Sequence, residues 1–135
     1  MPLITWGPQL ETGITSIDGQ HKRLVDIINK FSDAVKEGRK NEELGEIFDE
    51  LVDYTETHFT FEEKLMESHG YEEIIEHRRE HRAFTDQIRM DRDNFKAGVW
   101  ECEDRLMDYL RGWLVNHIQA SDRAYVPTLT EAGAE

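Results

Sequence analysis

The chain has 135 residues, of which 29 are acidic and 16 basic, and its formal charge at neutral pH is −13. This length suits one domain around one core, so we expect a single domain over residues 1–135. The negative charge opposes contact with phosphate backbones and argues against nucleic acid as a partner. No apolar stretch approaches the roughly 20 residues that span a bilayer, so we expect no membrane insertion.

Cysteine usage and the first residues indicate where the protein works. Cys102 is the single cysteine of the chain, so no internal disulfide can form. The opening segment MPLITWGPQLETG has neither the basic flank nor the long apolar run of an export signal. We therefore expect a cytoplasmic protein.

The first predicted helix covers about residues 18–37 and follows an N-terminal arm, residues 1–17, which should pack along the outside of the fold. Spacings of three and four place five residues on one face of this helix. They are His21, Leu24, Ile28, Phe31 and Val35. Gly38 then supplies a natural stop.

The second predicted helix covers about residues 41–69, with Asn41 as its N-cap and a stop near Gly70. Its stripe continues in the same phase for its whole length. The stripe is apolar at first and then turns polar, at Thr55, His58 and Glu62.

The third and fourth predicted helices cover about residues 71–96 and 99–118. The third keeps one face in register and stops before a glycine. That face carries Ile74, His77, His81, Phe84 and Ile88. The face of the fourth carries Val99, Cys102, Leu106, Leu110, Trp113 and His117. We interpret Cys102 as a small buried apolar residue. In the tail, residues 119–135, Pro127 is expected to interrupt any further helix.

The connections between these helices are only a few residues long. Short connections make consecutive helices run antiparallel. The sequence therefore predicts an all-α protein, an antiparallel up-down-up-down four-helix bundle with an N-terminal arm.

Histidines and carboxylates interrupt the apolar stripes at one level of the predicted bundle. His21 starts the first helix, His77 and His81 lie near the start of the third, and these starts share one end of an up-down bundle. His58 and Glu62 lie toward the end of the second helix, and His117 ends the fourth, so they reach the same end. Burying such groups without partners costs a few kcal/mol each, so we predict a bound metal.

Two spacings of four suggest two ions. His77 and His81 are neighbours on one helical face, and His58 with Glu62 repeats the geometry. A nitrogen-rich set suits iron, zinc or copper better than magnesium or calcium. The sixth histidine, His69, lies about 10 Å farther along the axis than Glu62, and we interpret it as a capping or surface group.

Four segments carry a family resemblance. They are IDGQHK (17–22), HFTFEEKLM (58–66), HRREH (77–81) and WLVNHIQASD (113–122). Together they resemble the hemerythrins, most closely the single-domain bacterial members, and the likeness runs from about Trp6 to Pro127.

The resemblance implies a di-iron centre that binds dioxygen reversibly. By this likeness, His77, His81 and His117 bind one iron, and His21 and His58 bind the other. Glu62 and Asp122, with an oxo or hydroxo group, bridge the two ions, which cycle between Fe²⁺ and Fe³⁺. Dioxygen binds at the open position of the two-histidine iron. The implied role is oxygen carriage, storage or delivery to an oxygen-consuming enzyme, without catalysis by the protein itself.

Two structural expectations accompany this assignment. An apolar wall of Phe59, Trp113, Leu114 and Ile118 should line the oxygen pocket and keep water and anions out. Asp122 follows His117 by five residues, a rotation of about 140° on a regular helix, so we predict a π-type turn or a break between them.

Parts of the sequence also fit functions other than an oxygen carrier. HRREH matches the HxxEH pattern of inverted zinc proteases, but Glu80 would have to project into the site and the chain looks helical throughout. Ferritin-like di-iron oxidases carry ExxH motifs, which this chain lacks. A di-iron oxidase or peroxidase activity, or oxygen, redox or iron sensing through a protein partner, remains the alternative.

Overall fold

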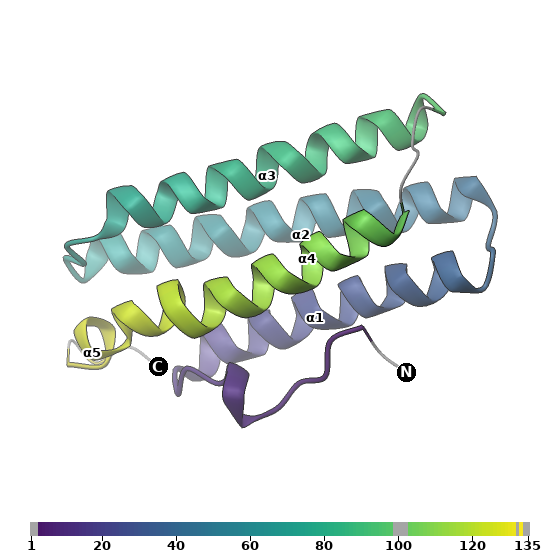
Figure 1. Ribbon diagram of the computed structural model, residues 1–135. Coiled ribbons are helices and arrows are strands. Elements are labelled where there is room, and N and C mark those ends of the chain that lie inside the picture. Colours follow the sequence, from purple (N-terminus) through teal and green to yellow (C-terminus); the bar gives the residue numbers. More distant parts are fainter. Residues whose placement is uncertain (1–2, 99–102, 132, 134–135) are drawn as a thin grey trace.

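The structure, a computed structural model, describes residues 3–98, 103–131 and 133. Within these residues every regular element is helical. The elements in chain order are a short 3₁₀ turn η1 (Pro8–Leu10), α1 (Thr15–Lys36), α2 (Asn41–Ser68), α3 (Ile74–Lys96), α4 (Glu103–Asn116), a π-helical segment η2 (His117–Asp122) and α5 (Arg123–Glu131). The four long helices lie side by side, consecutive ones run in opposite directions, and α5 continues from α4 at one end (Figure 1). The predicted four-helix bundle is confirmed.

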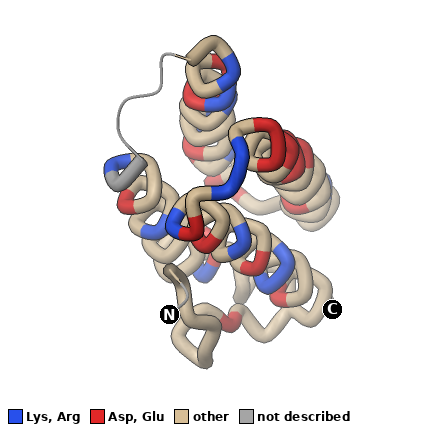
Figure 2. The backbone as a smooth tube through the Cα atoms, turned by 90° about the vertical axis from the view of Figure 1, so that its right-hand side faces the viewer, with Lys and Arg blue, Asp and Glu red and all other residues tan. Residues whose placement is uncertain are grey.

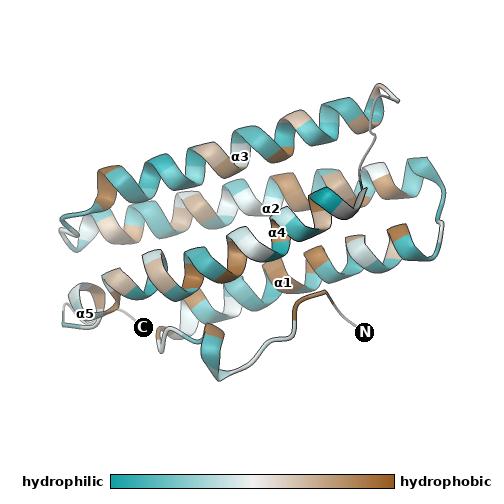
Figure 3. Ribbon diagram, viewed as in Figure 1, coloured by the Kyte–Doolittle hydropathy of each residue, from teal (hydrophilic) through white to brown (hydrophobic). Residues whose placement is uncertain are grey.

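Apolar side chains fill the half of the bundle that lies farther from the histidines. Along the long helices hydrophobic and hydrophilic residues alternate (Figure 3), as expected for helices with one buried face. Eight residues of this half are at 0% exposure, namely Leu24, Ile28, Phe31, Phe48, Leu51, Phe84, Ile88 and Leu110. A second, smaller apolar cluster consists of Ile14, Ile17, Met66, Tyr125 and Leu129.

Acidic and basic residues are interspersed along the helices (Figure 2), and most of them are exposed. Several of these residues pair between neighbouring helices. Lys96 on α3 bonds Asp49 on α2 at 2.7 Å, and Lys30 on α1 bonds Glu50 on α2 at 3.1 Å. Such exposed pairs contribute at most about 1 kcal/mol each, so burial of the apolar faces stabilises the bundle. Among the described residues no helix is long and apolar enough to cross a membrane.

Glycines end the first three long helices as predicted. Gly38 and Gly70 both have φ 69°, the left-handed conformation that glycine adopts without strain. The predicted N-cap is wrong, because Asn41 is the first helical residue and Lys40 occupies the cap position without a side-chain hydrogen bond. The third helix begins at Ile74, three residues later than predicted, because a turn follows Gly70.

The N-terminal arm packs against α1, as expected. The backbone N–H of Ile4 donates to Oδ1 of Asn29 and its carbonyl accepts from Nδ2, each at 2.8 Å. Oδ1 of Asp18 accepts bonds from the backbone N–H and the hydroxyl of Thr12, both at 2.8 Å, where α1 begins. The first helix starts at Thr15, three residues before the predicted start.

The chain after Asp122 differs from the prediction. We expected Pro127 to prevent a further helix, but it lies inside α5. Proline removes one backbone hydrogen bond, and burial of Tyr125 and Leu129, both at 0% exposure, offsets that loss. The predicted start of the fourth helix at Val99 and the burial of Cys102 lie outside the described residues.

Candidate metal centre

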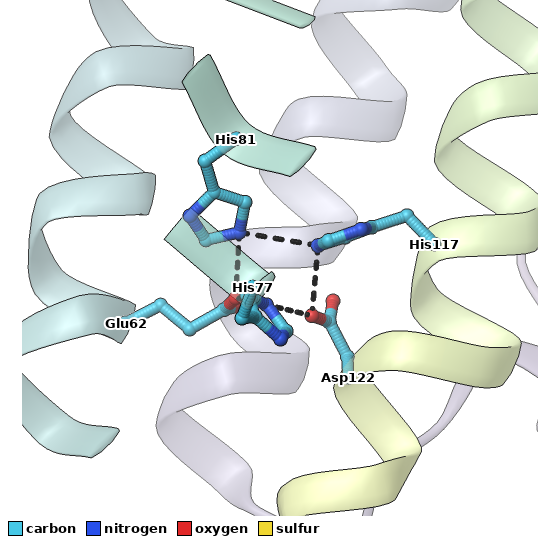
Figure 4. Close-up of side chains that lie close together, drawn as sticks. All are labelled: Glu62, His77, His81, His117 and Asp122. Atoms are coloured by element: carbon cyan, nitrogen blue, oxygen red, sulfur yellow. Dashed lines mark hydrogen bonds and ion pairs between the residues drawn. The ribbon is translucent and has the colours of Figure 1, made fainter. Parts of the chain in front are cut away.

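Four helical segments bring the seven predicted ligands to one place between the two apolar clusters. All seven are buried, with exposures from 0% to 5%. They are His21 from α1, His58 and Glu62 from α2, His77 and His81 from α3, and His117 and Asp122 from η2. Figure 4 shows five of them around a common centre. The predicted convergence at one end of the bundle is therefore observed.

These side chains form two groups that share one carboxylate. One group, which we call the three-histidine pocket, contains Glu62, His77, His81, His117 and Asp122. The other, the two-histidine pocket, contains His21, His58 and Glu62. Within each group the potential ligand atoms lie within 4.8 Å of one another.

Glu62 divides its two carboxylate oxygens between the two pockets. Oε1 lies 2.8 Å from Nε2 of His77 and 3.0 Å from Nε2 of His81. Oε2 lies 3.1 Å from Nε2 of His58 and 3.5 Å from Nε2 of His21. A carboxylate in this position can bind one ion through each oxygen.

Asp122 repeats this division from the other side of the centre. Its Oδ1 lies 3.0 Å from Nε2 of His77 and 3.1 Å from Nε2 of His117. Its Oδ2 lies 3.1 Å from Nε2 of His21. Two carboxylates therefore link the same two histidine groups.

The hydrogen bonds behind the imidazoles indicate which ring nitrogen faces the centre without a proton. Nδ1 of His81 lies 3.0 Å from the carboxylate of Glu63, and Nδ1 of His117 lies 3.4 Å from that of Glu80. Because an ionised carboxylate only accepts, each neutral ring carries its proton on Nδ1 and turns the Nε2 lone pair inward. Yet the two Nε2 atoms are 3.1 Å apart. A cation between them would satisfy both lone pairs.

The spacing of the donor atoms fits ligands around common ions. Neighbouring ligands of an octahedron with bonds of about 2.1 Å are separated by about 3 Å. In the three-histidine pocket, the distances from the carboxylate oxygens of Glu62 and Asp122 to the Nε2 atoms of the histidines are 2.8 to 3.1 Å. The donor set is rich in nitrogen, which suits a transition metal.

The two buried carboxylates of the centre stabilise positive charge on the groups around them. Burial alone would lower the pKa of His77, but hydrogen bonds and charges from Asp122 and Glu62 raise it to about 10. The same balance raises the pKa of His21 to about 9. Burial alone would raise the pKa of Glu62, and the surrounding histidines hold it well below the usual range. Bound cations would supply the same compensation that protons supply in the metal-free chain.

The π-helical segment η2 aligns His117 with Asp122, as predicted. A π turn pairs residues five apart, so both ends of the HIQASD segment face the centre. Ser121 within it donates to Oε1 of Glu80 at 2.6 Å, which connects η2 to α3. The same geometry turns Asp122 inward with 0% exposure.

The four predicted wall residues lie around the centre. The ring of Phe59 stacks on His81 with centroids 3.7 Å apart, and that of half-buried Trp113 stacks on His117 at 4.3 Å. Leu114 and Ile118 are buried. The two aromatic rings thus contact histidines of the three-histidine pocket. A role for all four in an oxygen pocket stays a prediction.

Four residues of the site were missed in the sequence. Gln20, Glu63 and Glu80 accept hydrogen bonds from outward-facing imidazole nitrogens, and Tyr125 donates to Oε2 of Glu62 at 3.2 Å. The first three each adjoin a ligand in the sequence, which was the available signal. Glu80 does not project into the centre as a protease base would; it lies behind His117 and is half-buried.

His69 behaves as predicted and belongs to neither pocket. It occupies the C-cap of α2, and its Nδ1 lies 2.8 Å from the carbonyl oxygen of Leu65. This contact satisfies one of the free carbonyls at the helix end.

Known proteins are similar to this chain in sequence and in fold. The hemerythrin HHE cation binding domain matches residues 12–129. The chain is 40% identical over 135 residues to a bacteriohemerythrin of Pseudomonas aeruginosa, covering 100% of this chain and 87% of that one. It is 34% identical to the bacteriohemerythrin of Methylococcus capsulatus, covering 96% and 99%. A solved wild-type hemerythrin superposes with a TM-score of 0.89 at 34% identity, covering 95% and 98%.

Proposed function

Because the chain belongs to the hemerythrin family, we propose that its buried centre holds two iron ions and binds dioxygen reversibly. The observation that carries this proposal is the convergence of five imidazole Nε2 atoms on two carboxylates that each face both pockets. When bound, a ferrous pair supplies two electrons that dioxygen can take up and return. The oxo or hydroxo bridge of the Fe²⁺/Fe³⁺ pair would complete the centre.

The residues divide the work of holding the ions. His77, His81 and His117 would hold one ion. His21 and His58 would hold the other with one ligand fewer, which leaves room there for dioxygen. Glu62 and Asp122 would join the two ions at a fixed separation. No side chain is required as a general acid or base.

The surroundings of the centre favour a carrier over an oxidase. Apolar clusters on both sides limit the entry of water and anions. The hydroxyl of Tyr125 is committed to Glu62 and is therefore not free to donate a proton elsewhere. We place Phe59, Trp113, Leu114 and Ile118 in the wall of the oxygen pocket, and Leu114 and Ile118 have at most 2% exposure.

The biological role follows from the same proposal. Residues 1–135 would act as one unit that stores dioxygen, carries it, or delivers it to an oxygen-consuming enzyme. We propose that this takes place in the cytoplasm, where a chain with one cysteine needs no disulfide.

The test is anaerobic loading with ferrous iron, followed by iron quantification and visible spectra before and after air. We expect two irons per chain and a new absorption band that disappears when oxygen is removed. His77→Ala should abolish the band, whereas His69→Ala should leave it unchanged. A band that decays to ferric protein within seconds would indicate an oxidase, and His77→Ala protein that still cycles would refute the assignment.

A further inference from the structure

The groups that hold the outer nitrogens of the imidazoles differ between the two pockets. In the three-histidine pocket these groups are carboxylates. Glu63 lies 3.0 Å from Nδ1 of His81, and Glu80 lies 3.4 Å from Nδ1 of His117. Two of the three imidazoles in this pocket are therefore backed by negative charge.

Among the described residues, no carboxylate is hydrogen-bonded to the outer nitrogens of the two-histidine pocket. Nδ1 of His58 lies 2.7 Å from the side-chain carbonyl oxygen of Gln20, a neutral acceptor. Nδ1 of His21 is buried and has no hydrogen-bond partner in the described part of the chain. The outer nitrogen of His58 thus faces an amide oxygen, and that of His21 faces no hydrogen-bond partner among the described residues.

The two carboxylates are themselves held in place. Arg78 donates through Nε to Oε1 of Glu63 at 3.2 Å, which leaves Oε2 for His81. Ser121 donates to Oε1 of Glu80 at 2.6 Å. Both acceptors are fixed before any ion arrives, so little ordering is needed when the ion binds.

A carboxylate behind an imidazole acts on the metal in two ways. It fixes the tautomer and the orientation of the ring, and it raises the basicity of the nitrogen that faces the ion. A neutral amide fixes the ring but adds no charge. Loss of such a partner typically costs 10–100-fold in metal affinity.

We propose that Glu63 and Glu80 are positioning residues that give the three-histidine pocket the higher metal affinity, so that the two ions load in order and this pocket fills first. The proposal rests on the proposed function, since it concerns the same centre. Glu62 and Asp122 serve both pockets and cannot create this order by themselves. The order follows from the third imidazole together with the two charged partners.

The test is an anaerobic titration of the metal-free protein with Co²⁺, a divalent ion that accepts imidazole and carboxylate ligands and has a visible spectrum. We expect two resolved binding steps in the unaltered chain. Glu63→Gln and Glu80→Gln should each weaken the first step by about 10–100-fold and change the second much less. Gln20→Glu should strengthen the second step and bring the two closer together.

Glu76→Gln is the matched control. It removes one negative charge from α3. Among the described residues Glu76 forms an ion pair with exposed Arg79 at 3.4 Å and none with the seven ligands. Its two binding steps should match those of the unaltered chain. Ser121→Ala removes a hydrogen bond to Glu80 but keeps the charge of Glu80, so it should weaken the first binding step by less than Glu80→Gln does. This variant replaces Glu63→Gln and Glu80→Gln as the test if those two fold poorly.

The outcomes separate this inference from the proposed function. Two ions that bind with equal affinity would overturn the loading order. If Glu63→Gln and Glu80→Gln bind both ions as Glu76→Gln does, the two carboxylates do not have the proposed role. The same conclusion follows if these two substitutions weaken both binding steps equally. A chain that binds neither ion would instead refute the proposed function.

Discussion

Tyr125 donates its phenol hydrogen bond to Oε2 of Glu62 over 3.2 Å and so connects the last helix, α5, to α2 across the centre. Burial, followed by the charges of Glu62 and Asp122, raises the pKa of Tyr125 far above its usual value. The hydroxyl is therefore a permanent donor. Its acceptor is the oxygen that faces the two-histidine pocket.

Replacing Tyr125 with Phe should destabilise the metal-free protein by about 1.5–3 kcal/mol, because a buried hydrogen bond to a charged group is lost. Urea unfolding followed by circular dichroism measures this change. Tyr71→Phe is the control, since its ring lies 6.1 Å from that of Tyr125 and the bond to Glu62 stays in place. Equal stability of the two variants would show that the hydroxyl of Tyr125 contributes nothing.

Replacing Asp122 with Asn should lower the pKa of both His21 and His77. Burial lowers the pKa of each histidine, and hydrogen bonds and charges from Asp122 and Glu62 raise it to about 9 for His21 and about 10 for His77. Removing the charge of Asp122 leaves Glu62 to oppose the effect of burial without it, so the pKa of each histidine should fall. NMR titration of the imidazole resonances in metal-free protein measures the change. Histidine pKa values that stay where they were would contradict this account of the charges.

The fold was predictable because its signals are periodic. Spacings of three and four define a buried face without reference to any partner helix, and Gly38, Gly70 and Gly98 mark the ends. The end of the chain was not predictable in this way. Local propensity predicts that Pro127 ends a helix. The helix continues because Tyr125 and Leu129 are buried in a cluster whose other members are distant in the sequence.

The positions of the five histidines and Glu62 were predictable because each occupies a stripe position that an apolar residue should hold. Asp122 lies off these stripes and was assigned only through the family resemblance. The outer partners of the histidines were not predictable, since Glu63 and Glu80 are two of 29 acidic residues and sit on the polar sides of their helices. Nothing local distinguishes them from solvated charges. Only the approach of α3 to α2 and η2 brings them behind His81 and His117.

Leu51→Ala should cost about 2–5 kcal/mol of unfolding free energy, because Leu51 is at 0% exposure in the apolar half and truncation leaves a cavity. The metal stoichiometry should stay the same, since Leu51 precedes His58 by seven residues, about 10 Å along α2. Ile75→Ala is the control, because Ile75 is 67% exposed and its truncation should change stability by less than about 0.5 kcal/mol. Loss of metal in Leu51→Ala without unfolding would contradict this separation of core and site.

The metal-free protein should lose stability as the pH rises above neutrality. The folded-state pKa values of His21 and His77, about 9 and about 10, exceed the ordinary value of 6.5. Their contribution is therefore fully present below about pH 6.5 and is lost as the pH rises through 9 to 10. Glu62 and Asp122 have lowered pKa values, so their contribution is present above the ordinary carboxyl range and is lost in acid.

Metal loading should reverse the alkaline part of this profile. An ion binds the deprotonated imidazoles, so rising pH removes a competitor and strengthens the loaded state. Melting temperatures of the metal-free and the metal-loaded protein at about pH 6 and pH 9 test both expectations. From pH 6 to pH 9 the melting temperature of the metal-free protein should decrease, and the increase caused by metal loading should become larger. Acidification toward pH 4 should release the ions as protons displace them. A metal-free melting temperature that is flat from pH 6 to 9, or a loaded protein that retains its ions at pH 4, would show that protons and metal do not compete for this centre.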